Sequence, residues 1–175
     1  RFYSEGVFND FFSFITTLGE SFIPVLLMAA VYWCFNKKAG TYMCLAEGVG
    51  GLVNSVLKIS FCVYRPWIRD PGIEPIAGAK TTATGYSFPS GHTQNVTAEF
   101  SAIALWAKRR WVTWLCTIII LLTGFSRMYL GVHTPLDVGV SLVVGLLTSL
   151  VCIRLFARLR PGAIRGMILA AMALV

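Results

Sequence analysis

Charged residues are scarce in this 175-residue sequence. Asp, Glu, Lys and Arg together make up 13% of the chain, against roughly 25% in soluble domains. Hydrophobic residues make up 56%, and the mean hydropathy is +0.70. These values exclude an ordinary soluble globular domain and predict a protein that is embedded in a lipid bilayer.

Metal-binding and disulfide patterns are also lacking. The chain has two histidines and no cluster of carboxylates or cysteines that is typical of a Mg²⁺ or Zn²⁺ site. The cysteines lie in or beside apolar runs without a CxxC pair, which favours free thiols over a disulfide framework. They are Cys34, Cys44, Cys62, Cys116 and Cys152. We therefore expect no metal and no cofactor.

The net charge of +7 does not predict a nucleic-acid partner, because the basic residues do not cover a soluble face. They gather in short connectors at residues 37–38, 108–110 and 154–165. Lys and Arg concentrate in the cytoplasmic loops of membrane proteins, so these connectors predict the cytoplasmic side of a plasma or cytoplasmic membrane. The polar stretches 65–88 and 126–137 are then expected on the extracytoplasmic face.

Apolar runs recur along the chain at lengths that suit helices. We predict spans at residues 21–35, 41–64, 90–107, 111–125 and 135–156, with a sixth, truncated span from residue 164. Aromatics spaced three and four apart in residues 1–20 predict an amphipathic interfacial helix, with a truncated first span as the alternative. Residues 67–88 are expected to form a polar loop. The fold class is therefore an all-α integral membrane bundle of about six helices, in one domain (1–175) of a longer chain.

Lys58 and Arg65 form the first polar stretch. Their separation of seven residues equals two helical turns, so we expect both side chains on one helix face, near Pro66, which closes the span. Two cations that converge at the end of a span indicate an anion site, with interfacial anchoring as the alternative.

Pro89-Ser90-Gly91-His92 forms the second stretch, at the start of a span. Free backbone N–H groups at a helix start bind anions. Ser90 can add a hydroxyl, and Gly91 lets an oxyanion approach the backbone. The alternative is a serine-capped helix with a surface histidine.

Residues 126–137 form the third stretch, which contains Arg127, His133 and Asp137. Thr134 and Pro135 are typical of the N-cap and first position of a helix, and Asp137 falls at the third position, as in a capping box. His133 is then expected at the helix mouth with a carboxylate beside it, which fixes the imidazole tautomer and favours the cation. Alone, this stretch is equally consistent with an ordinary capped turn.

Together, Lys58-x6-Arg65-Pro66, Pro89-Ser90-Gly91-His92 and Ser126-Arg127-x3-Gly131-x-His133-x3-Asp137 resemble the three signature motifs of the type-2 phosphatidic acid phosphatase superfamily. Their order and internal spacing match. The resemblance implies a helical bundle that hydrolyses phosphomonoesters or diphosphates without a metal. It implies that His133 attacks phosphorus and becomes a phosphohistidine, that Asp137 holds His133, and that His92 protonates the leaving oxygen. The residues implied to bind phosphate are Lys58, Arg65, Ser90, Gly91 and Arg127.

The membrane setting predicts a lipid phosphate or diphosphate as substrate. Phosphatidic acid, phosphatidylglycerophosphate, a polyprenyl diphosphate and a sphingoid-base phosphate all fit, and the sequence does not rank them. One alternative is a lipid phosphotransferase that uses the same site. A transporter or channel that binds an anion without chemistry would explain the three cations but not His92 or the pairing of His133 with Asp137. The vanadium haloperoxidases are similar at the site but soluble, which the spans argue against. The oligomeric state has no signal in the sequence.

Three further polar residues fall inside predicted spans. Glu47 and Asn54 are seven apart on one helix face, and Glu99 is seven residues after His92. A buried polar network that supports Lys58 and His92 is one hypothesis. Contacts between helices are the favoured alternative.

Overall fold

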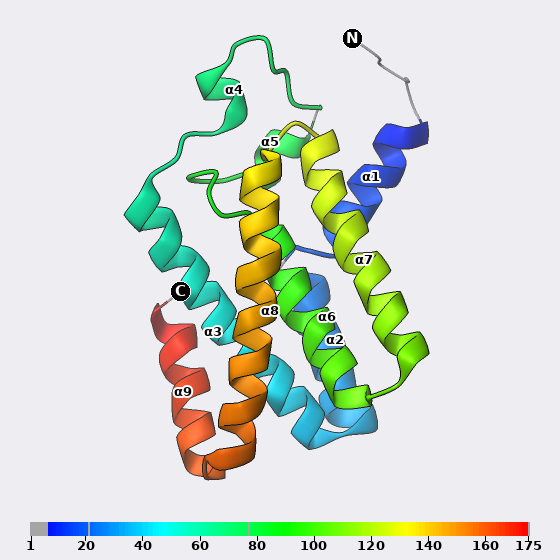
Figure 1. The fold of residues 1–175 in the computed structure, drawn as a ribbon, viewed down its shortest axis with the longest axis vertical. Coiled ribbons are helices and arrows are strands. Elements are labelled where there is room, and N and C mark those ends of the chain that lie inside the picture. The colour runs from blue at the N-terminus through cyan, green and yellow to red at the C-terminus, as the bar shows by residue number, and fades with distance from the viewer. Residues whose placement is uncertain (1–6, 21, 77, 175) are drawn as a thin grey trace.

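A computed structural model describes residues 7–20, 22–76 and 78–174. Within these ranges every regular element is a helix (Figure 1). The elements are α1 (Val7–Thr17), α2 (Phe22–Ala30), the π-helical segment η1 (Val31–Phe35), α3 (Lys37–Phe61), α4 (Pro66–Arg69), α5 (Ala79–Thr82), α6 (Gly91–Ala107), α7 (Arg110–Tyr129), α8 (Pro135–Arg158) and α9 (Pro161–Leu174). The all-α fold class is confirmed.

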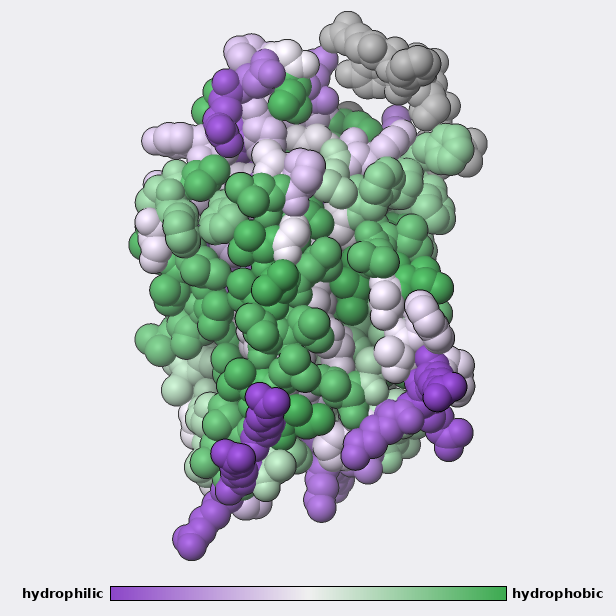
Figure 2. Space-filling model, viewed as in Figure 1, coloured by the Kyte–Doolittle hydropathy of each residue, from purple (hydrophilic) through white to green (hydrophobic). Residues whose placement is uncertain are grey.

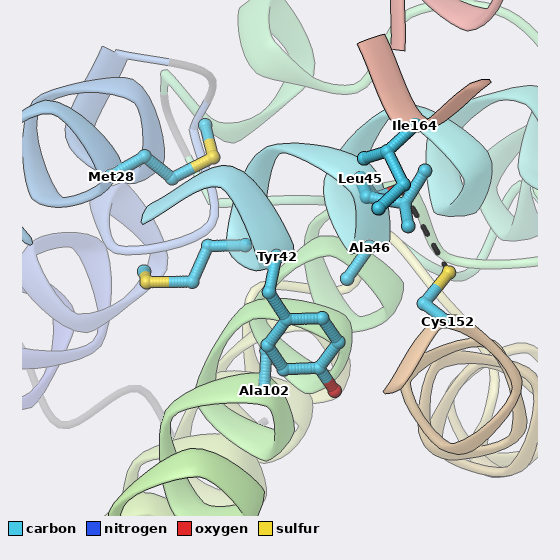
Figure 3. Close-up of a cluster of buried hydrophobic side chains, with 8 residues drawn as sticks. Met28, Tyr42, Leu45, Ala46, Ala102, Cys152 and Ile164 are labelled. Atoms are coloured by element: carbon cyan, nitrogen blue, oxygen red, sulfur yellow. Dashed lines mark hydrogen bonds between the residues drawn. The ribbon is translucent and has the colours of Figure 1, made fainter. Parts of the chain in front are cut away.

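The central helix of the bundle is α6, which packs against α3, α7 and α8, while α1 packs on α7 and α9 on α3. Small residues bring α6 and α8 close: a Cβ at Gly145 of α8 would lie 2.7 Å from the Cβ of Thr97. A buried cluster that includes Tyr42, Ala102, Cys152 and Ile164 joins α3, α6, α8 and α9 (Figure 3). This cluster lies near the start of α3 and the end of α6, away from the end of α3 and the start of α6.

Hydrophilic side chains gather at the two ends of the molecule, and a broad hydrophobic belt lies between them (Figure 2). Three stretches are long and apolar enough to cross a bilayer: 37–69, Arg110–Tyr129 and Pro135–Arg158. The bent α1–α2 pair is a fourth candidate. At 17 and 14 residues, α6 and α9 are shorter than the ~20 residues that a span needs. Length and composition alone therefore support fewer spans than the six predicted.

The helix boundaries differ from the predictions where side chains cap or extend them. Asn36 caps α3 by accepting hydrogen bonds from the backbone N–H groups of Lys38 and Ala39, at 2.9 and 3.2 Å, so α3 begins four residues earlier than predicted. Helix α7 continues four residues beyond residue 125 and carries Arg127 in its last turn. The predicted loop 67–88 contains most of α4 and all of α5.

The prediction for residues 1–20 can be followed from residue 7 onward, because residues 1–6 lie outside the described ranges. In α1, Phe12 packs on Phe125 and Tyr129 of α7, with ring centroids 5.4 and 4.5 Å apart. Phe8 and Phe14 are exposed on α1. The helix therefore has one face against the bundle and one face toward its surroundings.

Candidate active site

An open cavity of about 580 Å³ lies at the end of the bundle where α3 ends and α6 begins. Five of the residues predicted for phosphate chemistry line it: Lys58, Arg65, Gly91, His92 and His133. They come from all three motifs, although 75 positions (133 − 58) separate the first from the last. The fold therefore brings the three polar stretches to one place.

His133 lies between a guanidinium and a carboxylate. Its Nε2 atom is 2.9 Å from Nη1 of Arg65, and its Nδ1 atom is 3.5 Å from Oδ2 of Asp137. A guanidinium nitrogen only donates, so Nε2 must be the acceptor and the ring proton of the neutral imidazole belongs on Nδ1, facing Asp137. At 3.5 Å the contact with Asp137 is at most a weak hydrogen bond.

Burial controls the charge of His133, which lies between α7 and α8 and is 5% exposed. Removal from water lowers the pKa of His133 to about 4, and the nearby Arg65 and Arg127 guanidiniums contribute to this shift, while Asp137 opposes it. The imidazole is therefore neutral near pH 7, with the lone pair of Nε2 directed toward Arg65.

Asp137 is held by the start of α8. The expected capping box is present: Thr134 N–H donates to Oδ2 of Asp137 at 2.8 Å, and Asp137 N–H donates to Oγ1 of Thr134 at 3.2 Å. Ser87, which belongs to no motif, donates to the same Oδ2 at 2.6 Å. Sequence reasoning missed Ser87 because nothing local links it to a residue 50 positions away.

Arg65 is fixed mainly by backbone carbonyls. Its Nε donates to the carbonyl of Gly85 at 3.0 Å, its Nη2 to that of Thr84 at 2.6 Å, and its Nη1 to that of Val132 at 3.2 Å. The prediction that Lys58 and Arg65 share a helix face is wrong, because α3 ends at Phe61 and Arg65 has extended backbone. Both side chains nevertheless line the cavity, because the chain turns after the end of α3 and brings Arg65 back to the cavity.

The second motif forms the start of α6. Ser90 is the N-cap, and its Oγ accepts the N–H of Thr93 at 3.4 Å. A Cβ at Gly91 would lie 3.6 Å from Nζ of Lys58, so this glycine lies beside the cation of the first motif. The Nε2 atom of His92 is buried and has no hydrogen-bond partner among the described residues. His92 is therefore free to bond to a group in the cavity.

Arg127 is fully buried and is not among the residues that line the cavity. Its Nη1 donates to Oγ1 of Thr16 on α1 at 2.7 Å. Its Nε and Nη2 have no partner in the part of the chain that the structure describes. The residues after α1 also reach the site, since Gly19 and Glu20 line the cavity. Sequence reasoning did not connect α1 to the motifs, because 111 positions separate Thr16 from Arg127.

The buried polar residues of α3 and α6 are arranged as contacts between helices. The side-chain amide of Asn54 donates to Oε1 of Gln94 at 2.9 Å, and Gln94 donates to the carbonyl of Gly50 at 2.7 Å. Both carboxylate oxygens of Glu99 lack a partner among the described residues. The network hypothesis for Lys58 and His92 is therefore not supported by hydrogen bonds within the described ranges.

Among the described residues, no group of three or more His, Cys, Asp or Glu side chains is placed to hold an ion. The cavity is lined by the cations Lys58 and Arg65, which suit the oxygens of a phosphate directly.

Residues 39–161 match the PAP2 superfamily. Undecaprenyl-diphosphatase BcrC of Bacillus subtilis is 29% identical over 161 residues, which cover 90% of this chain and 79% of that protein. Phosphatidylglycerophosphatase B of Bacillus subtilis is 31% identical over 152 residues, which cover 79% and 70% of the two chains. The crystal structure of a transmembrane PAP2-type phosphatidylglycerolphosphate phosphatase from Bacillus subtilis is similar with a TM-score of 0.73 and 26% identity, over 88% of this chain and 79% of that one. The family match and the shared fold agree with the motifs: the chain belongs to the PAP2 superfamily.

Proposed function

We propose that the protein hydrolyses a lipid phosphate or lipid diphosphate at the extracytoplasmic face of the membrane, through a phosphohistidine formed on His133. As a member of the PAP2 superfamily it is a membrane-embedded phosphoric ester hydrolase. The observation that carries the proposal is the position of His133 between Arg65 and Asp137, in a cavity that Lys58 and His92 also line.

In the first step, Nε2 of His133 attacks phosphorus and the bond from phosphorus to the lipid oxygen breaks. Nη1 of Arg65 donates a hydrogen bond to the lone pair of Nε2, so a phosphoryl oxygen must replace Nε2 as the acceptor of this bond before Nε2 can attack. Protonated His92 gives its proton to the leaving oxygen, and Asp137 stabilises the positive charge that develops on His133. Lys58, Arg65 and Arg127 offset the charge of the phosphoryl oxygens, with Ser90 and Gly91 at the start of α6.

In the second step, water attacks the phosphohistidine and gives its proton to His92. The bond between Nε2 and phosphorus breaks, phosphate leaves, and both histidines return to their first state. Every proton transfer uses a side chain of this chain, so the cycle needs no metal.

The test is phosphate release from lipid phosphates and diphosphates by the detergent-purified full-length protein in excess EDTA. We expect release by the wild-type protein and none by a folded His133→Ala variant. With ³²P-labelled substrate, an acid-labile and base-stable label should appear on the wild-type protein only. Wild-type rates in folded His133→Ala would overturn the nucleophile assignment. Transfer to an added lipid alcohol in place of water would favour a phosphotransferase, and binding without turnover would favour a transporter.

Two native cysteines allow a test of the membrane face. Cys62 lies at the cavity end of α3 and Cys34 in η1 at the opposite end, and both are exposed. With a membrane-impermeant maleimide on intact cells, we expect labelling of Cys62 and protection of Cys34 until the cells are lysed. Cys62→Ser and Cys34→Ser variants identify each signal, and the reverse pattern would place the cavity on the cytoplasmic face.

A further inference from the structure

A second cavity, of about 390 Å³, lies at the opposite end of the bundle from the candidate active site. It forms where η1 and the start of α3 meet the turn between α8 and α9. Tyr32, Phe156, Leu159 and Ile164 give it apolar walls. None of these residues belongs to a motif or takes part in the proposed phosphatase cycle, so the cavity needs an explanation of its own.

Three cations line this cavity: Lys37, Lys38 and Arg165. No acidic residue that the structure describes lines it, and none of the three forms an ion pair with a described carboxylate. On α3, the nearest acidic residue is Glu47, ten positions beyond Lys37, which is about 15 Å along a helix. The cavity therefore holds positive charge that the described protein does not neutralise.

Packed elements, and not loose side chains, shape the cavity. Gly40 lets η1 lie directly on α3, because a Cβ there would be 2.5 Å from the Cβ of Tyr32. Ile164 is 5% exposed and belongs to the buried cluster of Figure 3. The ring of Phe156 packs edge-on against Tyr42, with centroids 6.0 Å apart. Ile164, Phe156 and Leu159 are thus part of the core, whereas Tyr32 is exposed.

The position of the cavity identifies the ligand class. It lies among the basic connectors, where the hydrophobic belt meets a hydrophilic end of the molecule (Figure 2). Basic pockets between membrane helices bind the head groups of anionic lipids. We propose that this cavity binds an anionic phospholipid of the leaflet opposite the candidate active site. Its phosphate lies among Lys37, Lys38 and Arg165, and its acyl chains lie along Tyr32 and Phe156.

A lipid bound in this way joins two parts of the bundle. Lys37 and Lys38 start α3, whereas Arg165 lies in the second turn of α9. One phosphate that contacts both elements holds α9 against α3, in addition to their direct packing. Binding to the folded state raises its stability by mass action, so an anionic lipid is expected to raise the unfolding temperature.

The experiment places the full-length protein in nanodiscs of phosphatidylcholine, with or without phosphatidylglycerol. Phosphatidylglycerol has no terminal phosphate, so the phosphatase site does not consume it. The unfolding temperature is measured, and retained lipid is counted by native mass spectrometry. The cavity variant carries Lys37→Gln, Lys38→Gln and Arg165→Gln. The control variant removes the same number of charges from the same end of the bundle, outside the cavity, with Lys108→Gln, Arg109→Gln and Arg110→Gln.

We expect phosphatidylglycerol to raise the unfolding temperature of the wild-type and control proteins, with at least one lipid retained. The cavity variant should lose most of that rise and bind the lipid roughly a hundredfold more weakly. The proposal would be overturned if phosphatidylglycerol raised the unfolding temperature of the cavity variant as much as that of the wild type. It would also be overturned if the control variant lost as much of that rise as the cavity variant, because the effect would then come from general surface charge. If the cavity variant fails to fold in phosphatidylcholine, Arg165→Gln alone is tested against Arg110→Gln. A similar rise with soluble glycerol phosphate, if the cavity variant loses it, would reject a lipid in favour of a free anion, because binding at the phosphatase site would persist in that variant.

Discussion

Thr16 lies on α1, far from the motifs in sequence, yet its hydroxyl is the one described hydrogen-bond partner of the Arg127 guanidinium. The contact is short, at 2.7 Å, and Thr16 is only 6% exposed. If Arg127 binds the phosphate, as proposed, the hydrogen bond to Thr16 fixes the orientation of the Arg127 guanidinium. We therefore predict that Thr16→Val weakens catalysis although Thr16 touches no reacting atom.

The expected fall in kcat/KM follows from the positive charge of the donor, the Arg127 guanidinium. A hydrogen bond that involves a charged group contributes about 1.5–3 kcal/mol, and more is lost when the charged partner is left buried and unsatisfied. Each 1.4 kcal/mol corresponds to about a factor of ten in rate. Thr16→Val keeps the size and branching of the side chain, so we expect kcat/KM to fall by roughly 10- to 100-fold.

The assay compares Thr16→Val and Thr16→Ser with Thr17→Val, a matched control on the same helix. Among the described residues, the hydroxyl of Thr17 donates to the carbonyl of Phe14, one turn back along α1. Thr16→Ser keeps the oxygen and should stay within a few-fold of wild type. Inhibition by orthovanadate, an oxyanion of phosphate shape, should weaken in Thr16→Val alone. If Thr16→Val and Thr17→Val have equal kcat/KM and equal vanadate inhibition, Arg127 does not depend on α1 and the reasoning fails.

Three further outcomes can be measured with single substitutions. Ser87→Ala removes a 2.6 Å hydrogen bond to Asp137 and should lower kcat about tenfold or more without a loss of expression; an unchanged kcat would show that the backbone cap alone holds the carboxylate. Glu99→Gln should leave kcat within about twofold and the unfolding temperature no lower, because both oxygens lack described partners and a neutral amide costs less to bury. Gly145→Ala should destabilise the protein by about 1–3 kcal/mol, whereas Gly139→Ala, with open space at its Cβ, should not; thermal unfolding compares the two.

Periodic and local features of the fold were predictable from the sequence. Ser90, Thr134 and Pro135 mark helix starts that the structure places at the same residues, because capping depends on neighbours within one turn. The end of α3 was not predictable in this way. A spacing of seven between Lys58 and Arg65 fits a continuous helix, but the chain leaves the helix at Cys62, which adopts a left-handed backbone. The two cations come together through the tertiary path of the chain.

Contacts that complete the site join residues that are far apart in the sequence, and no local sequence pattern predicts them. Ser87 reaches Asp137 across 50 positions, and Arg127 of α7 donates to Thr16 of α1 across 111 positions. The motifs identified the groups suited to phosphate chemistry because those groups have specific residue types and spacing. The residues that orient them are ordinary serines, threonines and carbonyls, which are common everywhere in a sequence and gain a role only from where the fold places them.

The protonation state of His133 does not follow from its residue type and its sequence neighbours alone. An adjacent carboxylate favours the imidazolium, and the sequence places Asp137 four residues after His133. The structure adds burial and the Arg65 guanidinium, and together these outweigh the carboxylate and lower the pKa of His133 to about 4. A nucleophile must be neutral to attack, so the buried environment favours the reactive form near pH 7. Asp137 therefore does not charge the resting imidazole. In the proposed mechanism, it orients Nδ1 and stabilises the positive charge that appears when Nε2 bonds to phosphorus. Under this proposal, His133 is neutral before the reaction, and Asp137 is placed to stabilise the charge that His133 gains during it.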